Sequence, residues 1–155
     1  MPIIFIRQEK LSLSRQIGGK HIKKKVLFLC TGNSCRSQMA EGILRYYKGD
    51  EYEVFSAGTN PSGIDPMAIK VMAEIGIDIS GHKSKSVEEF LDKEFDLVIT
   101  VCDKAKEMCP VFYRGGKRIH WSFIDPKEAS GSEEEVLQVF RRVRDEIKSH
   151  ILEEL

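Results

Sequence analysis

The residues around Cys30 have the types and spacing of a site that binds and attacks an anion. Cys30 ends a short apolar run, and Arg36 follows six positions later, where a helical pattern begins. A strand that leads through a tight loop into a helix gathers several backbone N–H groups around one point. These groups and the guanidinium are expected to favour the thiolate of Cys30, which is the nucleophilic form. The stretch therefore predicts a sulfur nucleophile aimed at a tetrahedral oxyanion.

The loop after Cys30 supplies the predicted oxyanion site. Arg36 can hold two oxygens of an arsenate or phosphate in bidentate fashion. Ser37 either donates a hydrogen bond to the Cys30 sulfur or only caps the following helix. Asn33 is expected to hold the loop in shape with an αL conformation, the alternative being a plain turn residue. The predicted loop residues are Thr31, Gly32, Asn33, Ser34, Cys35 and Arg36, with Cys35 as a small structural group beneath the helix.

A second pair of cysteines, Cys102 and Cys109, follows another apolar run. Neither this pair nor Cys30 with Cys35 has the C-x2-C spacing of a zinc knuckle, so we expect no metal site. In a chain without a secretory signal, paired cysteines are more often redox-active than structural. The alternative for the second pair is two unrelated buried thiols.

Composition limits the class of protein. The 155 residues suit one domain, and their 41% hydrophobic content is enough for a core. The formal net charge is zero, so no general attraction to nucleic acid or anionic lipid is expected. No apolar run has the length of a membrane span, and residues 3–6 are too short for a secretory segment. We therefore expect a cytoplasmic protein that binds neither nucleic acid nor membrane.

Apolar runs alternate with helical patterns along the chain, which predicts a small doubly wound α/β domain with four parallel strands and helices on both faces. Residues 1–24 lie outside this pattern as an extension without an assigned function, and residues 25–155 form the single domain. Strands are expected at 26–29, 52–57, 95–101 and 118–121. Helices are expected from residue 37, after Asp65-Pro66, and after the capping-box residues Ser86 and Ser132.

Ligands of such sheets bind at the carboxyl ends of the strands. Cys30, Cys102 and Asp125 all lie at or just after predicted strand ends, so we expect them on one rim. The pattern Cys30-x5-Arg36-Ser37, with Asn33 inside the loop, resembles the low-molecular-weight protein tyrosine phosphatase superfamily. The stretch from Thr31 through Gln38-Met39-Ala40-Glu41 to Gly42 is more similar still to its thioredoxin-coupled arsenate reductase branch. The resemblance covers about residues 25 to 150.

The resemblance implies a catalytic cycle without a cofactor. Cys30 attacks arsenate while Asp125 protonates the departing oxygen, Cys102 then attacks the Cys30 sulfur, and arsenite leaves. Cys109 next attacks Cys102, and thioredoxin reduces the resulting disulfide. The implied catalytic residues are Cys30, Arg36, Ser37, Cys102, Cys109 and Asp125. A helix over residues 103–108 would rise about 10 Å, farther than the roughly 7 Å that a disulfide spans, so we expect it to unwind.

Three alternatives stay open at this stage. A low-molecular-weight protein tyrosine phosphatase shares the first step, but Lys127-Glu128 stand where an aromatic pair would receive a phosphotyrosine ring. The second alternative is a non-enzymatic thiol sensor, which would give Asp125 no role. The reductant of a monomeric arsenate reductase can be glutaredoxin or a small thiol instead of thioredoxin.

Relatives with a potassium site use the loop Asn and a helix Glu, here Asn33 and Glu41, and we hypothesise that the Lys85 ammonium replaces the ion.

Overall fold

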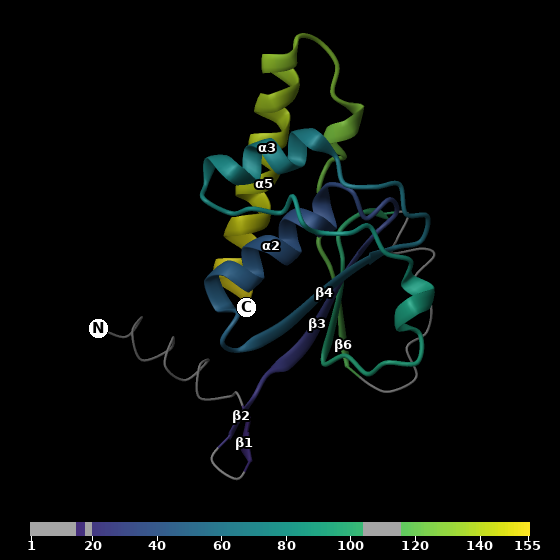
Figure 1. The fold of residues 1–155 in the computed structure, drawn as a ribbon, viewed down its shortest axis with the longest axis vertical. Coiled ribbons are helices and arrows are strands. Elements are labelled where there is room, and N and C mark those ends of the chain that lie inside the picture. The colour runs from purple at the N-terminus through teal and green to yellow at the C-terminus, as the bar shows by residue number, and fades with distance from the viewer. Residues whose placement is uncertain (1–14, 18–19, 104–115) are drawn as a thin grey trace, which may run out of the picture.

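A parallel sheet of four strands, in the order β4-β3-β5-β6, forms the centre of the computed structural model (Figure 1). The structure describes residues 15–17, 20–103 and 116–155. The strands are β3 (Lys24–Cys30), β4 (Tyr52–Gly58), β5 (Leu97–Thr100) and β6 (Lys117–His120). All four predicted strands are confirmed, with ends that differ by one or two residues.

The path of the chain places Cys30 at the switch point of the sheet. From β3 the chain runs to β4 on one side, and it then returns to β5 on the other side of β3. Cys30 is paired with Gly58 of β4, while Leu29 is paired with Thr100 of β5. The carboxyl ends of the strands on both sides of β3 therefore border the loop that follows Cys30, which is where a doubly wound sheet binds ligands.

The helices begin where the capping residues predict. The side chain of Asp65 accepts a hydrogen bond from the Met67 N–H, and both Ser86 and Ser132 form complete capping boxes. The short helix predicted after Ser86 is a single 3₁₀ turn. The helical elements are α2 (Arg36–Lys48), α3 (Pro66–Glu74), η1 (Val87–Phe90), η2 (Pro126–Glu128) and α5 (Glu133–Glu154).

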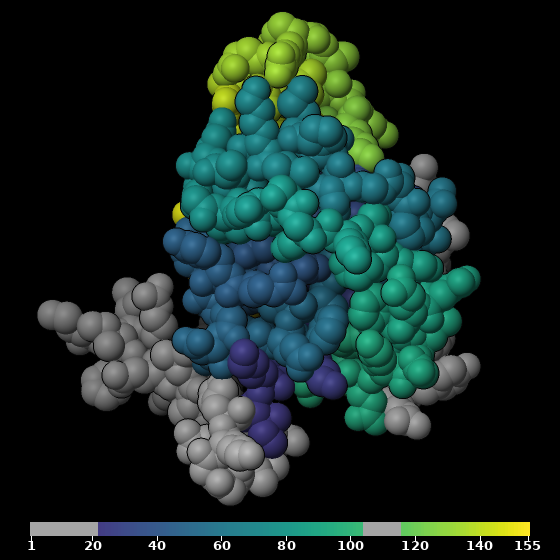
Figure 2. Space-filling model, in the orientation of Figure 1, coloured from purple at the N-terminus to yellow at the C-terminus, as the bar shows by residue number. Residues whose placement is uncertain are grey.

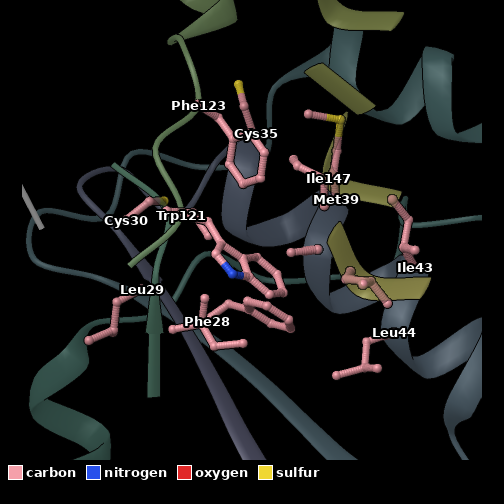
Figure 3. Packing of buried hydrophobic residues seen from close by; sticks show 14 of the residues in the cluster. Phe28, Leu29, Cys30, Cys35, Met39, Ile43, Leu44, Trp121, Phe123 and Ile147 are labelled. Carbon is pink, nitrogen blue, oxygen red and sulfur yellow. The ribbon is translucent and has the colours of Figure 1, made fainter. Parts of the chain in front are cut away.

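Both faces of the sheet are covered. On one face α2 packs on β3 and β4 and against α5, and α3 in turn packs against α5 (Figure 1). Phe28 and Trp121 fill the space between the sheet and these helices, with Met39 and Ile147 opposite them (Figure 3). Burying these apolar side chains supplies the main driving force for the fold.

The other face is covered around η1. Phe90 of η1 and Phe95 both pack edgewise against Phe55 of β4, with ring centroids 5.8 and 5.6 Å away, and tilt against each other at 6.0 Å. Leu29 points away from the Phe28 side of the sheet (Figure 3). In the space-filling view, the start of α5 and the residues before it form one end of the molecule (Figure 2).

The described part of the predicted extension forms a small hairpin. Strands β1 (Arg15–Ile17) and β2 (Lys20–Ile22) pair antiparallel with each other, apart from the four-stranded sheet. Strand β3 begins at Lys24, one residue before the predicted start of the domain. Within the described ranges, no helix combines the length and apolar character that crossing a membrane requires.

The close approach of β4 to the loop after Cys30 leads to a first prediction. A methyl group at Gly58 would lie 2.5 Å from the Thr31 carbonyl oxygen and 2.8 Å from the Asn33 backbone nitrogen. Because both are backbone atoms, the loop itself must shift. We expect Gly58→Ala to lower the free energy of unfolding by about 1–3 kcal/mol in urea denaturation. Gly81→Ala, where the added methyl meets nothing within 4 Å, is the control; equal midpoints for the two variants would contradict the close packing.

Candidate active site

The sulfur of Cys30 is surrounded by hydrogen-bond donors. The Ser37 hydroxyl oxygen lies 2.7 Å from Cys30 Sγ, and the Asn33 backbone N–H donates to the same sulfur at 3.1 Å. The Asn33 side-chain amide donates to Ser37 Oγ at 2.8 Å, which leaves the Ser37 hydrogen to point at the sulfur. The predicted contact between Ser37 and Cys30 is therefore present, and its direction suits a thiolate acceptor.

Asn33 holds the loop in the predicted shape. It is fully buried and has φ of 47°, the left-handed region that asparagine tolerates better than most residues. Its amide nitrogen donates to Ser37 and Ser56, and its side-chain oxygen accepts from Gln38 Nε2 and from the Lys85 backbone N–H. Both donors and both acceptor positions of the side chain are thus used. Asn33 is a structural centre of the loop and not a plain turn residue.

Burial acts against the ionisation expected for Cys30. The residue is only 3% exposed, and this burial raises the pKa of its thiol. Hydrogen bonds from the Ser37 hydroxyl and from the backbone N–H groups of Ser37 and Asn33 lower the pKa, while nearby Cys102 raises it further. The sequence reveals the hydrogen-bond donors of the loop but not how deeply the sulfur is buried. The effect of desolvation on the Cys30 pKa is larger than that of the donors.

Arg36 joins the loop to the segment that carries Asp125. Its Nη1 donates to the Phe123 carbonyl oxygen at 3.1 Å, and its Nη2 lies 3.5 Å from Asp125 Oδ2. Asp125 also caps η2, because its Oδ1 accepts from the Lys127 N–H at 3.0 Å. The proposed acid and the proposed anion-binding arginine, far apart in sequence, are therefore direct neighbours. The bidentate grip of Arg36 on an oxyanion stays a prediction.

Cys102 lies beside the loop after Cys30. Its Sγ is 3.4 Å from the Thr31 Oγ1, and the preceding residue donates its backbone N–H to the Leu29 carbonyl oxygen at 2.8 Å. Cys102 is only 3% exposed. Cys109 and the expected helix over residues 103–108 fall almost wholly within residues 104–115, outside the described part of the chain; only Asp103 is described.

Cys35 lies on the helix side of the loop, near Phe123 and apart from Cys30 (Figure 3). It is buried, and burial raises the pKa of its thiol to about 12. A thiol with so high a pKa stays protonated at neutral pH and is a poor nucleophile. Its position agrees with the structural role predicted for it.

Several residues that support the site were not found from the sequence. Gln38 Nε2 donates to the carbonyl oxygens of Asn33 and Lys83 in addition to the Asn33 side chain, and Ser84 Oγ donates to the carbonyl oxygens of Gly32 and Asn33. A glutamine that follows the loop arginine and serine at a helix start was a usable signal. Ser56 and Ser84 carried no signal, because only the fold brings them to the loop.

Glu41 lies behind the loop among two cations, Arg45 and Lys85, and the imidazole of His82. Its Oε1 accepts from the Ser56 hydroxyl at 2.5 Å and lies 3.7 Å from Lys85 Nζ. Its Oε2 is 2.8 Å from Arg45 Nη1 and 3.5 Å from His82 Nδ1. Lys85 Nζ also donates to the Lys83 carbonyl oxygen at 2.6 Å. The Lys85 ammonium therefore lies between two oxygen acceptors, while the Lys85 backbone N–H donates to Asn33 Oδ1. That the ammonium replaces a potassium ion stays a hypothesis.

Comparisons with known proteins agree with this geometry. The family described as low molecular weight phosphotyrosine protein phosphatase matches residues 25–154. The chain is 52% identical over 129 residues to an arsenate reductase of Halalkalibacterium halodurans, covering 83% of this chain and 93% of that protein. It is 49% identical over 130 residues to an arsenate reductase of Bacillus subtilis, covering 84% and 94%. A solved arsenate reductase in the phosphate binding state superposes with a TM-score of 0.73 at 38% identity, covering 83% of this chain and 94% of that one.

The donors around Cys30 predict how its reactivity depends on pH. Because burial raises the pKa of its thiol, alkylation of Cys30 by iodoacetamide should accelerate with pH beyond the range of an ordinary thiol, which titrates near about 8.5. Ser37→Ala removes a hydrogen bond that favours the thiolate, so the pKa rises further and alkylation at pH 8 slows. Ser149→Ala, on the exposed side of α5, is the control. Peptide mass spectrometry assigns the modified cysteine; an unchanged rate for Ser37→Ala would contradict the assigned role.

Proposed function

Because this chain belongs to the low molecular weight phosphotyrosine protein phosphatase family, in its arsenate reductase branch, we propose that it reduces arsenate to arsenite through a relay of thiols. One observation carries the proposal beyond the family. Cys102, more than seventy residues after the nucleophile, contacts Thr31 of the nucleophile's own loop at 3.4 Å. A phosphatase has no use for a second thiol at this place, whereas a reductase needs one.

The first step uses the loop, the arginine and the acid. The thiolate of Cys30 attacks arsenic, so that a sulfur–arsenic bond forms while an arsenic–oxygen bond breaks. Arg36 exchanges its present partners for two oxygens of the arsenate, because charge-assisted bidentate bonds to an oxyanion are the stronger ones. Asp125, next to Arg36, supplies the proton with which the departing oxygen leaves as water.

The next two steps move an electron pair. The Cys102 thiolate attacks the sulfur of Cys30, and a disulfide forms while the sulfur–arsenic bond breaks. The electrons of that bond go to arsenic, which leaves as arsenite, reduced from the +5 to the +3 state. Cys109 then attacks the sulfur of Cys102 and releases Cys30 as a thiolate. Two thiols, Cys102 and Cys109, have been oxidised for each arsenate reduced.

A dithiol partner must restore the enzyme, and we propose thioredoxin for that role and the cytoplasm as the location. The chain is proposed to act as a monomer. Residues 1–24 are proposed to be an extension, to which no function is assigned. The alternative of a tyrosine phosphatase is not favoured: Lys127 follows the acid and its Nζ contacts Ser62 Oγ at 3.4 Å, where an aryl ring would need an aromatic surface.

The relay is tested by arsenate-dependent oxidation of NADPH in the presence of thioredoxin and thioredoxin reductase. We expect Cys102→Ser and Cys109→Ser each to lose turnover by at least a hundred-fold, roughly the loss of an essential covalent group. Both variants should keep whatever slow hydrolysis of p-nitrophenyl phosphate the wild type shows, because that reaction needs only the Cys30 loop. Arsenate turnover that survives both substitutions would remove the relay. Replacing thioredoxin by glutaredoxin or glutathione in the same assay identifies the reductant.

The position of Lys85 predicts that the enzyme does not depend on potassium. Melting temperature and arsenate turnover should be the same in KCl and NaCl at equal ionic strength, because an ammonium already faces Glu41. Lys85→Met should lower the free energy of unfolding by about 1 kcal/mol, since Glu41 is only 6% exposed and loses one of its cations. Lys83→Met, which removes a neighbouring lysine side chain, is the matched control. A specific rise of wild-type stability with potassium would contradict the assignment.

A further inference from the structure

His120 lies between the two residues that flank the relay cysteine. It ends β6, and its Nδ1 is 2.7 Å from the hydroxyl of Thr100, which ends the neighbouring β5. Its Nε2 is 2.9 Å from Asp103 Oδ1. Thr100 lies two residues before Cys102 and Asp103 one residue after it. We call Thr100, Asp103 and His120 the Cys102 bracket.

Both ring nitrogens of His120 have a partner within the bracket. In the neutral ring with its hydrogen on Nε2, that N–H donates to Asp103 and Nδ1 accepts from the Thr100 hydroxyl. In the imidazolium, both nitrogens donate, and Thr100 can turn its own hydrogen to the Ile119 carbonyl oxygen 3.5 Å away. Ser122 Oγ, at 3.4 Å, adds a weaker contact to the same oxygen of Asp103. The two hydrogen bonds of His120 therefore connect the residues on both sides of Cys102 to the end of β6.

We propose that His120 and Asp103 are positioning residues for Cys102, holding its sulfur at Thr31 in readiness for attack on the sulfur of Cys30. This inference rests on the proposed function, and it concerns only the second step, in which the new disulfide forms and the electron pair of the sulfur–arsenic bond passes to arsenic. A misplaced Cys102 sulfur would slow this step, because displacement at sulfur requires the reacting atoms to be close and aligned.

The exposure of Asp103 and His120 indicates that their contact positions Cys102 and adds little to the overall stability of the fold. The Asp103 side chain is 78% exposed and that of His120 is 20% exposed, whereas Cys102 is 3% exposed. A polar contact so open to water contributes little to the stability of the fold. Its loss should therefore leave the melting temperature nearly unchanged while loosening the short segment that carries Cys102. Neither residue touches the Cys30 loop by a contact that the described part of the chain records.

Alkylation of Cys102 in the fully reduced enzyme tests the bracket without any catalysis. Asp103→Ala should raise the rate at which iodoacetamide modifies Cys102 by roughly five- to ten-fold, because a loosened segment exposes the buried sulfur. Asp103→Asn keeps an acceptor for the Nε2–H of His120 and should behave like the wild type. Asp92→Ala, another exposed aspartate, is the control for removal of a carboxylate. Peptide mass spectrometry separates Cys102 from the other cysteines.

A single-turnover experiment then tests the consequence for the relay. Reduced enzyme is mixed with arsenate, quenched at intervals and analysed for the Cys30–Cys102 and Cys102–Cys109 disulfides. Asp103→Ala should slow disulfide formation by roughly five- to ten-fold relative to the wild type and Asp92→Ala, with rescue by Asp103→Asn. Hydrolysis of p-nitrophenyl phosphate, which needs only the Cys30 loop, should be the same in all four proteins.

The outcomes distinguish the bracket from the proposed function. If the wild type forms no disulfide with arsenate, the reductase assignment fails, and the alkylation rates still decide whether the bracket holds Cys102. If Cys102 of Asp103→Ala is alkylated no faster than Cys102 of the wild type, the bracket is overturned. A variant Asp103→Asn that matches Asp103→Ala in both assays would also overturn it, because the effect would then come from charge and not from the hydrogen bond. A fall in melting temperature of Asp103→Ala by several degrees would assign the pair a merely structural role.

Discussion

The left-handed conformation of Asn33 is the constraint on which the site depends. In this conformation its backbone N–H donates to the Cys30 sulfur at 3.1 Å. A non-glycine residue in this region costs roughly 1–2 kcal/mol. The cost is offset by four hydrogen bonds of the buried side chain, which reach the start of α2, the strand β4 and the loop at Lys85. One residue thus fixes the loop to three other parts of the fold.

Two opposing effects meet at the nucleophile. Burial raises the pKa of the Cys30 thiol, while the hydroxyl of Ser37 and the backbone donors of the loop lower it. Burial also removes water from the place where an oxyanion would bind, so that each hydrogen bond there is stronger than in bulk solvent. A sulfur that was freely exposed would ionise more readily but would stand in a much weaker anion site. In this structure desolvation prevails over the donors at the sulfur itself.

The parallel sheet brings together chemistry from three distant stretches of the chain. Cys30 ends β3, Cys102 follows β5, and Asp125 lies shortly after β6. The strands run in the same direction and are neighbours in the sheet, so their carboxyl ends, and the residues that follow them, share one edge. The contacts of Cys102 with Thr31 and of Asp125 with Arg36 follow from this topology. His120, also at a strand end, takes its place between Thr100 and Asp103 for the same reason.

The roles of Cys102 and Asp125 came from the resemblance to a known family. Local patterns in the sequence determined the strands, the capped helix starts, the loop between Cys30 and Arg36, and the candidate Ser37. These features depend on hydrophobic periodicity, capping chemistry and short-range spacing, all of which neighbouring residues express. Only the tertiary structure decided the depth of the Cys30 sulfur and hence the direction of its pKa shift. It alone also brought Ser56, Ser84 and His120 to their partners. The reason is physical: desolvation and contacts between distant segments arise from packing, to which no local window of residues has access.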